Sequence, residues 1–397
     1  MKFVNRQISA WVGLWMILLV ASCTPKDPNP TNTYLVSSEK ITQLTKEQII
    51  TQITQSGLAG GVPVSAFIQN GCTVYRLTYH TKNTDGTAID ASGLVLVPDR
   101  SGALSMMSVQ HGTITTNSQA PSVFTAGTEA TLVGPFAAAL GYIVVYPDYL
   151  GYGASQQTEH PYEHRESLGA TSLDMLMAAK EFVATNGVSW NNKLYIAGYS
   201  EGGFATMALQ QKLEQLTNSP FQLKASSCGS GAYDKTSFTK YLINNTTSGA
   251  PSANSLYIWV LTTYNRLYNL KRPMTDFFKE PYATQIQNQG RAASVGVSLN
   301  TIITDSFKKG LNDGSDTGFL NALKDNDAYT FVPKTPTLLT HGTSDQLVFY
   351  LNSENAYNAM KAKGATNVTF TPFPGKGHDT ALPDFLLATI QFFSANP

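Results

Sequence analysis

Cysteine and charge are both scarce in this sequence. The 397 residues include three cysteines, too few for the disulfide framework that stabilises small secreted domains. Charged residues make up 14% of the chain, against roughly 25% in average soluble proteins, and 27 acidic residues balance 27 basic ones. A chain without a basic surplus lacks the electrostatic basis for binding nucleic acid, so we expect no nucleic-acid partner.

Long hydrophobic runs are also missing beyond the first residues. The run "WVGLWMILLV" follows Lys2 and Arg6 and is too short to span a bilayer. The next residues, "VASC", resemble a lipobox ending at Cys23. We therefore expect residues 1–22 to be a lipoprotein signal peptide and Cys23 to be lipidated, with an ordinary signal peptide as the alternative. The protein is then exported and lipid-anchored to a bacterial membrane, in the periplasm or on the cell surface.

The residues after Cys23 have the composition of a linker. The stretch "TPKDPNPTNT" contains three prolines and few apolar groups, so we expect residues 23–40 to form a flexible tether. Two cysteines remain in the rest of the chain. Cys72 opens a predicted strand and Cys228 lies near the end of a distant one, so we expect them to be too far apart to form a disulfide.

Short apolar runs alternate with longer helical patterns through much of the chain. The runs "LSMMSVQHG" and "YIVVYPD" are typical of buried strands, and "ESLGATSLDMLMAAKEFVATNG" is typical of a helix. Two earlier runs, "CTVYRLTYHT" and "DASGLVLVPD", predict an antiparallel start to the sheet. The alternation predicts an α/β fold with a mostly parallel central sheet and helices on both faces.

The alternation stops after Asp234 for about 95 residues, as judged by apolar spacing. This segment is rich in aromatic residues, and its apolar residues have helical spacing. We expect a helical lid insertion over residues 235–330, between core segments 41–234 and 331–397. A plain second packing layer is the alternative interpretation.

The motif "GYSEG" places Ser200 between a predicted strand and a predicted helix. A serine that attacks a carbonyl needs a sharp strand-to-helix turn, and small residues two positions before and after it prevent collisions there. Gly198 and Gly202 occupy those positions. The surrounding strand and helix make Ser200 the candidate nucleophile, whereas the bare motif often arises by chance.

A nucleophilic serine needs a histidine base and an acid that orients the histidine. His378 lies in the glycine-rich loop "GKGHD" between the last predicted strand and the last predicted helix. Asp345 follows the strand "TPTLL" and is the favoured acid, because strand ends meet at one edge of a parallel sheet. Asp234, after the preceding strand, is the main competitor, and Asp148 and Asp379 are weaker candidates.

The oxyanion of an acyl-transfer reaction needs two backbone N–H donors. We expect one from Glu201, which follows the nucleophile at a helix N-terminus, and one from Thr113 in the loop "HGT". The Glu201 carboxylate must then point away from the oxyanion. His111 is interpreted as a residue that orients this loop.

Metal chemistry has little support in the sequence. His160 and His164 in "HPYEH" are four residues apart, but Pro161 interrupts the segment and a third ligand is missing. We therefore expect no metal site.

The combination of "HGT", "YPDYLGYG", "GYSEGG", "HGTSD" and "GKGH", with an insertion before the acid strand, resembles the secretory lipase branch of the α/β-hydrolase superfamily over residues 72–397. The resemblance implies a carboxylic ester hydrolase without cofactor and a lid over residues 235–326. It also implies a triad and two backbone donors, which are Ser200, Asp345 and His378, with Thr113 and Glu201.

Three other functions remain open at this point. The same triad could belong to a serine peptidase or to a carbohydrate esterase that removes acetyl or feruloyl groups. A non-catalytic lipoprotein that binds glycans through its aromatic residues is the third alternative. For the hydrolase, the expected partners are small-molecule, lipid or glycan esters, together with the membrane reached through Cys23.

Overall fold

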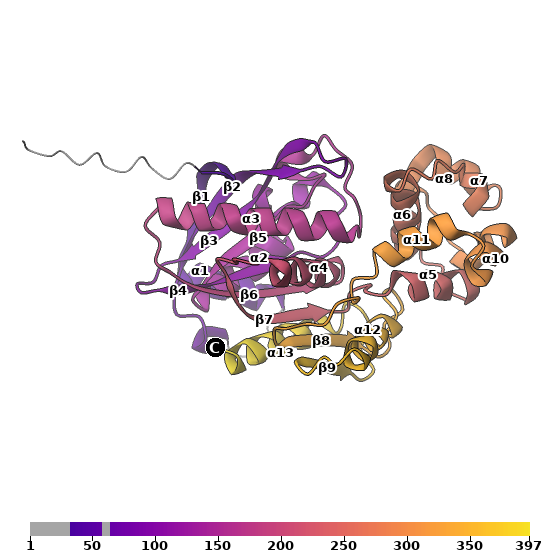
Figure 1. Ribbon diagram of the computed structural model, residues 1–397. Helices are drawn as coiled ribbons and strands as arrows, with labels where there is room; N and C mark the ends of the chain where they lie inside the picture. The colour runs from indigo at the N-terminus through magenta and orange to yellow at the C-terminus, as the bar shows by residue number, and fades with distance from the viewer. Residues whose placement is uncertain (1–31, 58–63) are drawn as a thin grey trace, which may run out of the picture. The chain divides into compact units, whose positions relative to one another are not determined.

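The computed structural model describes residues 32–57 and 64–397 (Figure 1). The expected signal peptide, the lipidation site Cys23 and residues 23–31 of the expected tether lie outside these ranges. Cys72 and Cys228 are both buried and both free. In the described part of the chain, no helix has the length and hydrophobicity to cross a membrane.

The described residues form one sheet of nine strands in the order β1-β2-β3-β5-β4-β6-β7-β8-β9. Strands β1, β2, β3 and β5 pair antiparallel, and every pairing from β5 through β4 to β9 is parallel. The predicted mostly parallel sheet and its antiparallel start are confirmed. The strands are β1 Leu35–Leu44, β2 Cys72–Lys82, β3 Ala88–Pro98, β4 Leu104–Gln110, β5 Tyr142–Pro147, β6 Trp190–Tyr199, β7 Gln222–Gly229, β8 Thr337–Gly342 and β9 Val368–Phe373.

Helices cover both faces of the sheet, as predicted, because strands buried on two sides need an apolar layer against each. Side chains of α1, α2 and α13 pack in one apolar cluster with the sheet. Those of α3, α4 and α12 pack in the clusters of the opposite face. These helices are α1 Lys46–Ser56, α2 Glu129–Ala139, α3 Arg165–Thr185, α4 Glu201–Gln215, α12 Leu351–Ala362 and α13 Leu382–Ala395.

The first strand corrects the predicted tether. Residues 35–40, expected to be flexible, belong to β1, which pairs with β2 along its length. The Glu181 carboxylate of α3 accepts hydrogen bonds of 2.7–2.9 Å from the backbone N–H groups of Thr33, Tyr34 and Leu35. The prediction was wrong here because β1 is an edge strand with mostly exposed polar side chains, so its sequence lacks an apolar pattern.

Between β7 and β8 the chain forms only helices, which Figure 1 shows grouped together and apart from the strands. The segment has its own apolar cluster, in which Phe277, Phe307 and Phe319 pack edge to face. Such a cluster allows an insertion to fold beside the sheet without disturbing its register. These helices are α5 Lys235–Asn244, α6 Pro251–Leu267, α7 Met274–Phe277, α8 Tyr282–Gln289, α9 Leu299–Ile302, α10 Asp305–Asp313 and α11 Thr317–Asp325.

Candidate active site

Ser200 occupies the sharp turn between β6 and α4. Its backbone angles, φ 60° and ψ −125°, are strained for a residue with a side chain. The Ser200 N–H donates to the Gly229 carbonyl of β7 at 2.9 Å, which fixes the turn against the sheet. The serine hydroxyl is thereby held at the carboxyl edge of the parallel strands.

The glycines around Ser200 are required by close backbone approach. A Cβ atom on Gly202 would lie 2.0 Å from the Gln110 carbonyl oxygen, and one on Gly198 would lie 2.2 Å from the Gly202 carbonyl oxygen. Both distances are far below van der Waals contact. The steric reason for the "GYSEG" pattern is therefore present in the fold.

His378 connects Ser200 to Asp345. His378 Nε2 lies 2.9 Å from Ser200 Oγ, and His378 Nδ1 lies 2.7 Å from Asp345 Oδ2. Asp345 and His378 both lie in loops that follow strand ends, Asp345 after β8 and His378 after β9. The Tyr199 hydroxyl donates to the His378 carbonyl at 2.7 Å and holds this loop beside Ser200. The three side chains proposed from the sequence thus form one hydrogen-bonded chain.

The Asp345 carboxylate is buried and ionised. Its Oδ1 accepts from the backbone N–H groups of Leu347 and Val348, each at 2.9 Å. Burial raises the pKa of Asp345, but hydrogen bonds with His341 and His378 outweigh burial and lower that pKa to about 2. An ionised Asp345 accepts the Nδ1 proton of His378, so Nε2 is free to accept the serine proton.

His341 contacts Asp345 and the loop that carries it. Its Nε2 lies 2.6 Å from the Val348 carbonyl oxygen, which can only accept, so this nitrogen carries a proton. The same Nε2 lies 3.3 Å from Asp345 Oδ2. His341 is fully buried, and Ser353 Oγ lies 2.7 Å from its Nδ1. His341 therefore fixes the loop that presents Asp345.

The other acid candidates are engaged elsewhere. Asp234 caps α5 by accepting from the Ser237 N–H at 2.8 Å, and it also accepts from Asn355 Nδ2. Asp148 accepts from the Ser122 N–H and the Ser92 hydroxyl in a buried cluster. Asp379 is exposed, beside His378 in sequence. Asp345 is the carboxylate that meets His378.

The loop after β4 lies beside Ser200, where the second oxyanion donor was expected. A Cβ atom on Gly112 would lie 3.9 Å from the Cβ of Ser200. The Gly112 N–H is occupied by Glu129 Oε2 at 3.0 Å, and the two ring nitrogens of His111 face the carbonyls of Gly112 and Asp148. In the described ranges, no protein hydrogen bond engages the N–H of Thr113 or Glu201.

The Glu201 carboxylate points away from Ser200 into a buried pair. Its Oε1 lies 2.7 Å from His160 Nε2, and the two side chains are 1% and 3% exposed. His160 Nδ1 donates to the Leu150 carbonyl at 2.7 Å, since a carbonyl only accepts. A hydrogen bond between Nε2 and Oε1 needs one proton between these two atoms, so the pair has no net charge.

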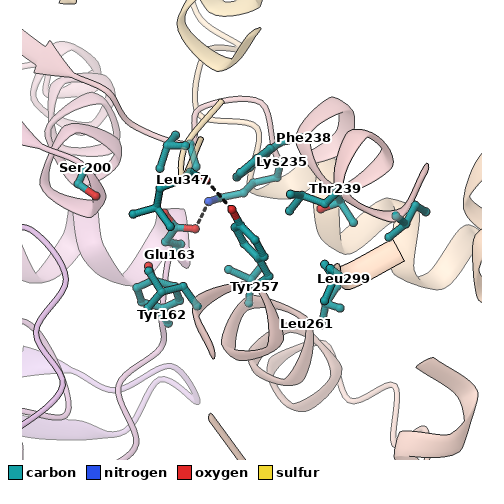
Figure 2. Close-up of a pocket in the computed structure, with 16 residues that line it drawn as sticks. Tyr162, Glu163, Ser200, Lys235, Phe238, Thr239, Tyr257, Leu261, Leu299 and Leu347 are labelled. Atoms are coloured by element: carbon teal, nitrogen blue, oxygen red, sulfur yellow. Dashed lines mark hydrogen bonds and ion pairs between the residues drawn. The ribbon is translucent and has the colours of Figure 1, made fainter. Parts of the chain in front are cut away.

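A pocket extends from Ser200 into the helical insertion (Figure 2). Most of its wall is apolar and comes from α5, α6 and the loop after β8. Tyr257 of α6 spans the pocket wall, and its hydroxyl donates to the Leu347 carbonyl at 2.8 Å. Two charged side chains, Glu163 and Lys235, also line the pocket and pair with each other.

Several of these residues were not predicted from the sequence. Glu129 and Lys235 stand in no motif. Glu163 and His341 lie within "HPYEH" and "HGTSD", but neither was given a role there. His160 was considered only as a metal ligand. Among the described residues, no group of histidine, cysteine, aspartate and glutamate side chains is arranged to hold a metal ion.

Solved structures with this fold include enzymes of known type. The structure superposes on a putative hydrolase from Legionella pneumophila with a TM-score of 0.79 and 26% identity, covering 91% of this chain and 98% of that one. The rice cell wall degrading esterase LipA from Xanthomonas oryzae gives a TM-score of 0.78 at 21% identity, covering 93% and 100%. Candida antarctica lipase A gives 0.64 at 19% identity, covering 91% and 82%. The predicted α/β-hydrolase fold is confirmed.

Sequence comparison identifies the family. Lipase 10 of Candida albicans is 25% identical over 250 residues, which are 60% of this chain. They are 51% of that protein, so the chain spans about half the length of this relative. The secretory lipase family model matches residues 115–393, well over half of the chain. This protein therefore belongs to the secretory lipase family, as its motifs predicted.

Proposed function

We propose that this protein is a serine-dependent carboxylic ester hydrolase that acts through an acyl-enzyme on Ser200. The observation that carries the proposal is the hydrogen-bonded chain from Ser200 Oγ through His378 to Asp345. Membership of the secretory lipase family supports the same reaction class. No cofactor is needed, because the three side chains supply nucleophile, base and orienting acid.

The proposed reaction has two acyl-transfer steps. Ser200 Oγ attacks the ester carbonyl as His378 Nε2 takes its proton, and the carbonyl oxygen receives hydrogen bonds from the Thr113 and Glu201 N–H groups. His378 then protonates the leaving alkoxide. Water repeats the attack on the acyl-enzyme, returning Ser200 and releasing the acid.

The pocket favours esters over peptides. Its wall is largely apolar, which suits an acyl or aryl group, and its two charged residues pair with each other. A peptidase that holds a peptide terminus needs an unpaired charge for that purpose. A glycan-binding role would leave the aligned serine, histidine and aspartate without a purpose.

We also propose that residues 235–330 form a lid over Ser200. The segment has its own apolar cluster and supplies α5 and α6 to the pocket wall. Hydrogen exchange of α6 should slow when an alkyl phosphonate is attached to Ser200, because the bound chain fills the pocket. Unchanged exchange throughout α5 and α6 would count against the lid.

Hydrolysis of p-nitrophenyl esters from acetate to palmitate tests the proposed function. Protein lacking residues 1–23 should hydrolyse part of this series, and a fluorophosphonate probe should add one phosphonyl group, on the peptide containing Ser200. The chain length with the highest kcat/KM measures how far the pocket accepts an acyl chain. A folded protein that hydrolyses no ester and is not labelled would overturn the proposal.

Breaking the His160–Glu201 pair is expected to lower both stability and activity. In His160→Gln the Glu201 carboxylate remains buried without the His160 imidazole. It lies on the same residue whose backbone N–H is the proposed oxyanion donor. We expect a loss of about 3–5 kcal/mol in the free energy of unfolding and a fall in kcat of about tenfold or more, equivalent to about 1.4 kcal/mol.

The double variant His160→Gln with Glu201→Gln supplies the control. It removes the unpaired charge and should recover part of the loss in kcat, measured with the same ester. Equal kcat in the single and double variants would show that the carboxylate charge does not affect the reaction.

Lipidation of Cys23 is proposed as the membrane anchor. The full chain, produced in a bacterium that processes lipoproteins, should incorporate an alkyne-tagged fatty acid and sediment with membranes. Cys23→Ala should lose the label and the membrane fraction, whereas Cys72→Ala should retain both, because Cys72 is buried in the domain. Label retained in Cys23→Ala would refute this anchor.

A further inference from the structure

The Glu163–Lys235 ion pair is the charged feature of an otherwise largely apolar pocket (Figure 2). Lys235 Nζ contacts Glu163 Oε2, and the two side chains are 2% and 7% exposed. Burial raises the pKa of Glu163 and lowers that of Lys235, while each partly offsets this for the other. Such a pair is costly to bury, so its place in the pocket calls for an explanation.

Backbone contacts fix the position of both residues. Glu163 has a left-handed conformation, with φ 50°, and its carbonyl accepts from the Tyr264 hydroxyl at 2.8 Å. Lys235 is the first residue of α5, directly after the cap Asp234. The backbone positions from which the two side chains extend are therefore well defined.

The pair is also tied to the reacting centre. Tyr162, the residue before Glu163, lies with its hydroxyl 3.0 Å from Thr113 Oγ1, in the loop beside Ser200. Tyr162, Glu163, Lys235 and Ser200 all line the same pocket. A group that binds in this pocket while its ester lies at Ser200 therefore shares the pocket with the ion pair.

Both charged groups have unused hydrogen-bonding capacity. The ammonium of Lys235 has three N–H donors, and its contacts among the described residues are Glu163 Oε2 and the face of Phe204 at 4.5 Å. Glu163 Oε1 has no hydrogen bond in the described ranges. One hydroxyl could therefore accept from Lys235 and donate to Glu163 while the pair stays neutral.

If the Glu163–Lys235 pair only connected the insertion to the core, it would not need to line the pocket. Arg165 and Asp325 already connect the start of α3 to the insertion, through contacts of 2.7 and 3.2 Å, and neither lines the pocket. An anionic ligand is disfavoured because it would compete with Glu163 for the single ammonium. A neutral hydroxyl is the chemistry that both partners can bind.

We propose that Glu163 and Lys235 form a polar subsite that binds a hydroxyl on the part of the substrate occupying the pocket. The inference rests on the proposed ester hydrolysis and names its substrate class as hydroxylated esters. The hydroxyl belongs to the acyl group or to the alcohol, according to which part enters the pocket.

Matched esters with and without a hydroxyl test the subsite and distinguish its two sources. For the acyl group, we would compare ethyl cinnamate with its 3- and 4-hydroxy derivatives, and ethyl decanoate with the 10-hydroxy ester. For the alcohol, we would compare benzyl acetate with 3- and 4-hydroxybenzyl acetate. At least one hydroxylated ester should have kcat/KM about tenfold or more above its partner, the expected gain from a hydrogen bond to a charged group.

Variants show whether the ion pair causes the preference. In the double variant Glu163→Leu with Lys235→Met, which keeps a similar volume and removes both charges and their hydrogen-bonding groups, the ratio should fall towards one. Arg165→Gln, which loosens the insertion outside the pocket, should keep the ratio. If the double variant does not fold, Glu163→Gln and the ratio in the unmodified protein decide the question.

Two results would overturn the subsite. One is equal rates on each hydroxylated and plain ester in the folded protein, which refutes the subsite while leaving ester hydrolysis intact. The other is a hydroxyl preference that persists in the folded double variant. Failure to hydrolyse any ester, plain or hydroxylated, would instead refute the proposed function and the subsite together.

Discussion

If Ser200 is the nucleophile as proposed, Ser200→Ala is expected to lower kcat for ester hydrolysis by a factor on the order of 10⁶, as loss of the triad serine does in subtilisin. The reason is that the proposed mechanism forms its acyl-enzyme on the Ser200 hydroxyl, which this substitution removes. His378 Nε2 would lose the hydroxyl that lies 2.9 Å away, and an alanine methyl cannot replace it. The measurement is the initial rate with the best ester of the p-nitrophenyl series.

A matched serine separates loss of chemistry from loss of fold. Ser172, in α3, is buried, whereas Ser200 is part-buried, and the Ser172 hydroxyl has no hydrogen bond among the described residues. Ser172→Ala should therefore keep both activity and phosphonate labelling. Ser200→Ala should melt close to the unmodified protein and take up no label. Hydrolysis within tenfold of the unmodified rate in purified Ser200→Ala would exclude the acyl-enzyme.

Asp345→Asn is expected to lower kcat by about 10³- to 10⁴-fold, because an asparagine amide no longer holds the histidine in the required tautomer. The amide can donate to His378 Nδ1, which places the imidazole proton on Nε2, facing Ser200. Asp234→Asn is the matched control, since Asp234 caps α5 and follows the neighbouring strand. It should change kcat by less than about threefold. A larger loss in Asp234→Asn than in Asp345→Asn would reverse the assignment of the acid.

Asp345 also predicts a dependence of stability on pH. Its folded-state pKa of about 2 lies below the ordinary value of 3.8, so the ionised carboxylate favours the folded state. The contribution, on the order of 2 kcal/mol at neutral pH, is lost as pH falls from about 4 to about 2. Chemical unfolding at pH 6 and pH 2.5 should show a smaller acid-induced loss in Asp345→Asn. An equal loss in both proteins would contradict this account.

Local sequence determined the turn that presents Ser200, the proposed nucleophile. A serine between glycines, after an apolar run and before an amphipathic one, specifies a strand, a tight turn and a helix. The requirement is steric and local: Gly202 passes so close to Gln110 that no side chain fits. The alternation of apolar runs likewise predicted the mostly parallel sheet and helices on both faces.

One strand and two helices near the start of the chain were missed. No strand was predicted at β1 and no helix at α1 or α2, and the predicted tether extended through residue 40. Helix α2 is apolar over most of its length and contains Pro135, so no one-sided apolar pattern marks it as a helix. β1 is polar because only one of its edges and little of its surface are covered. Helix α1 begins with a capping box between Thr45 and Gln48, a signal that short-range inspection could have found.

The sequence by itself determined which residue types were available and the turn that presents Ser200, because both depend on neighbours in the chain. It left Asp345 and Asp234 as competitors for one role, since each follows a strand that ends at the same edge of the sheet. Only the tertiary structure separated them, by placing His378 against one and a helix N-terminus over the other. The pairs Glu163–Lys235 and His160–Glu201 join residues 72 and 41 positions apart. The two side chains of each pair meet only when folding brings their elements together and excludes water. No pattern of neighbouring residues indicates that contact.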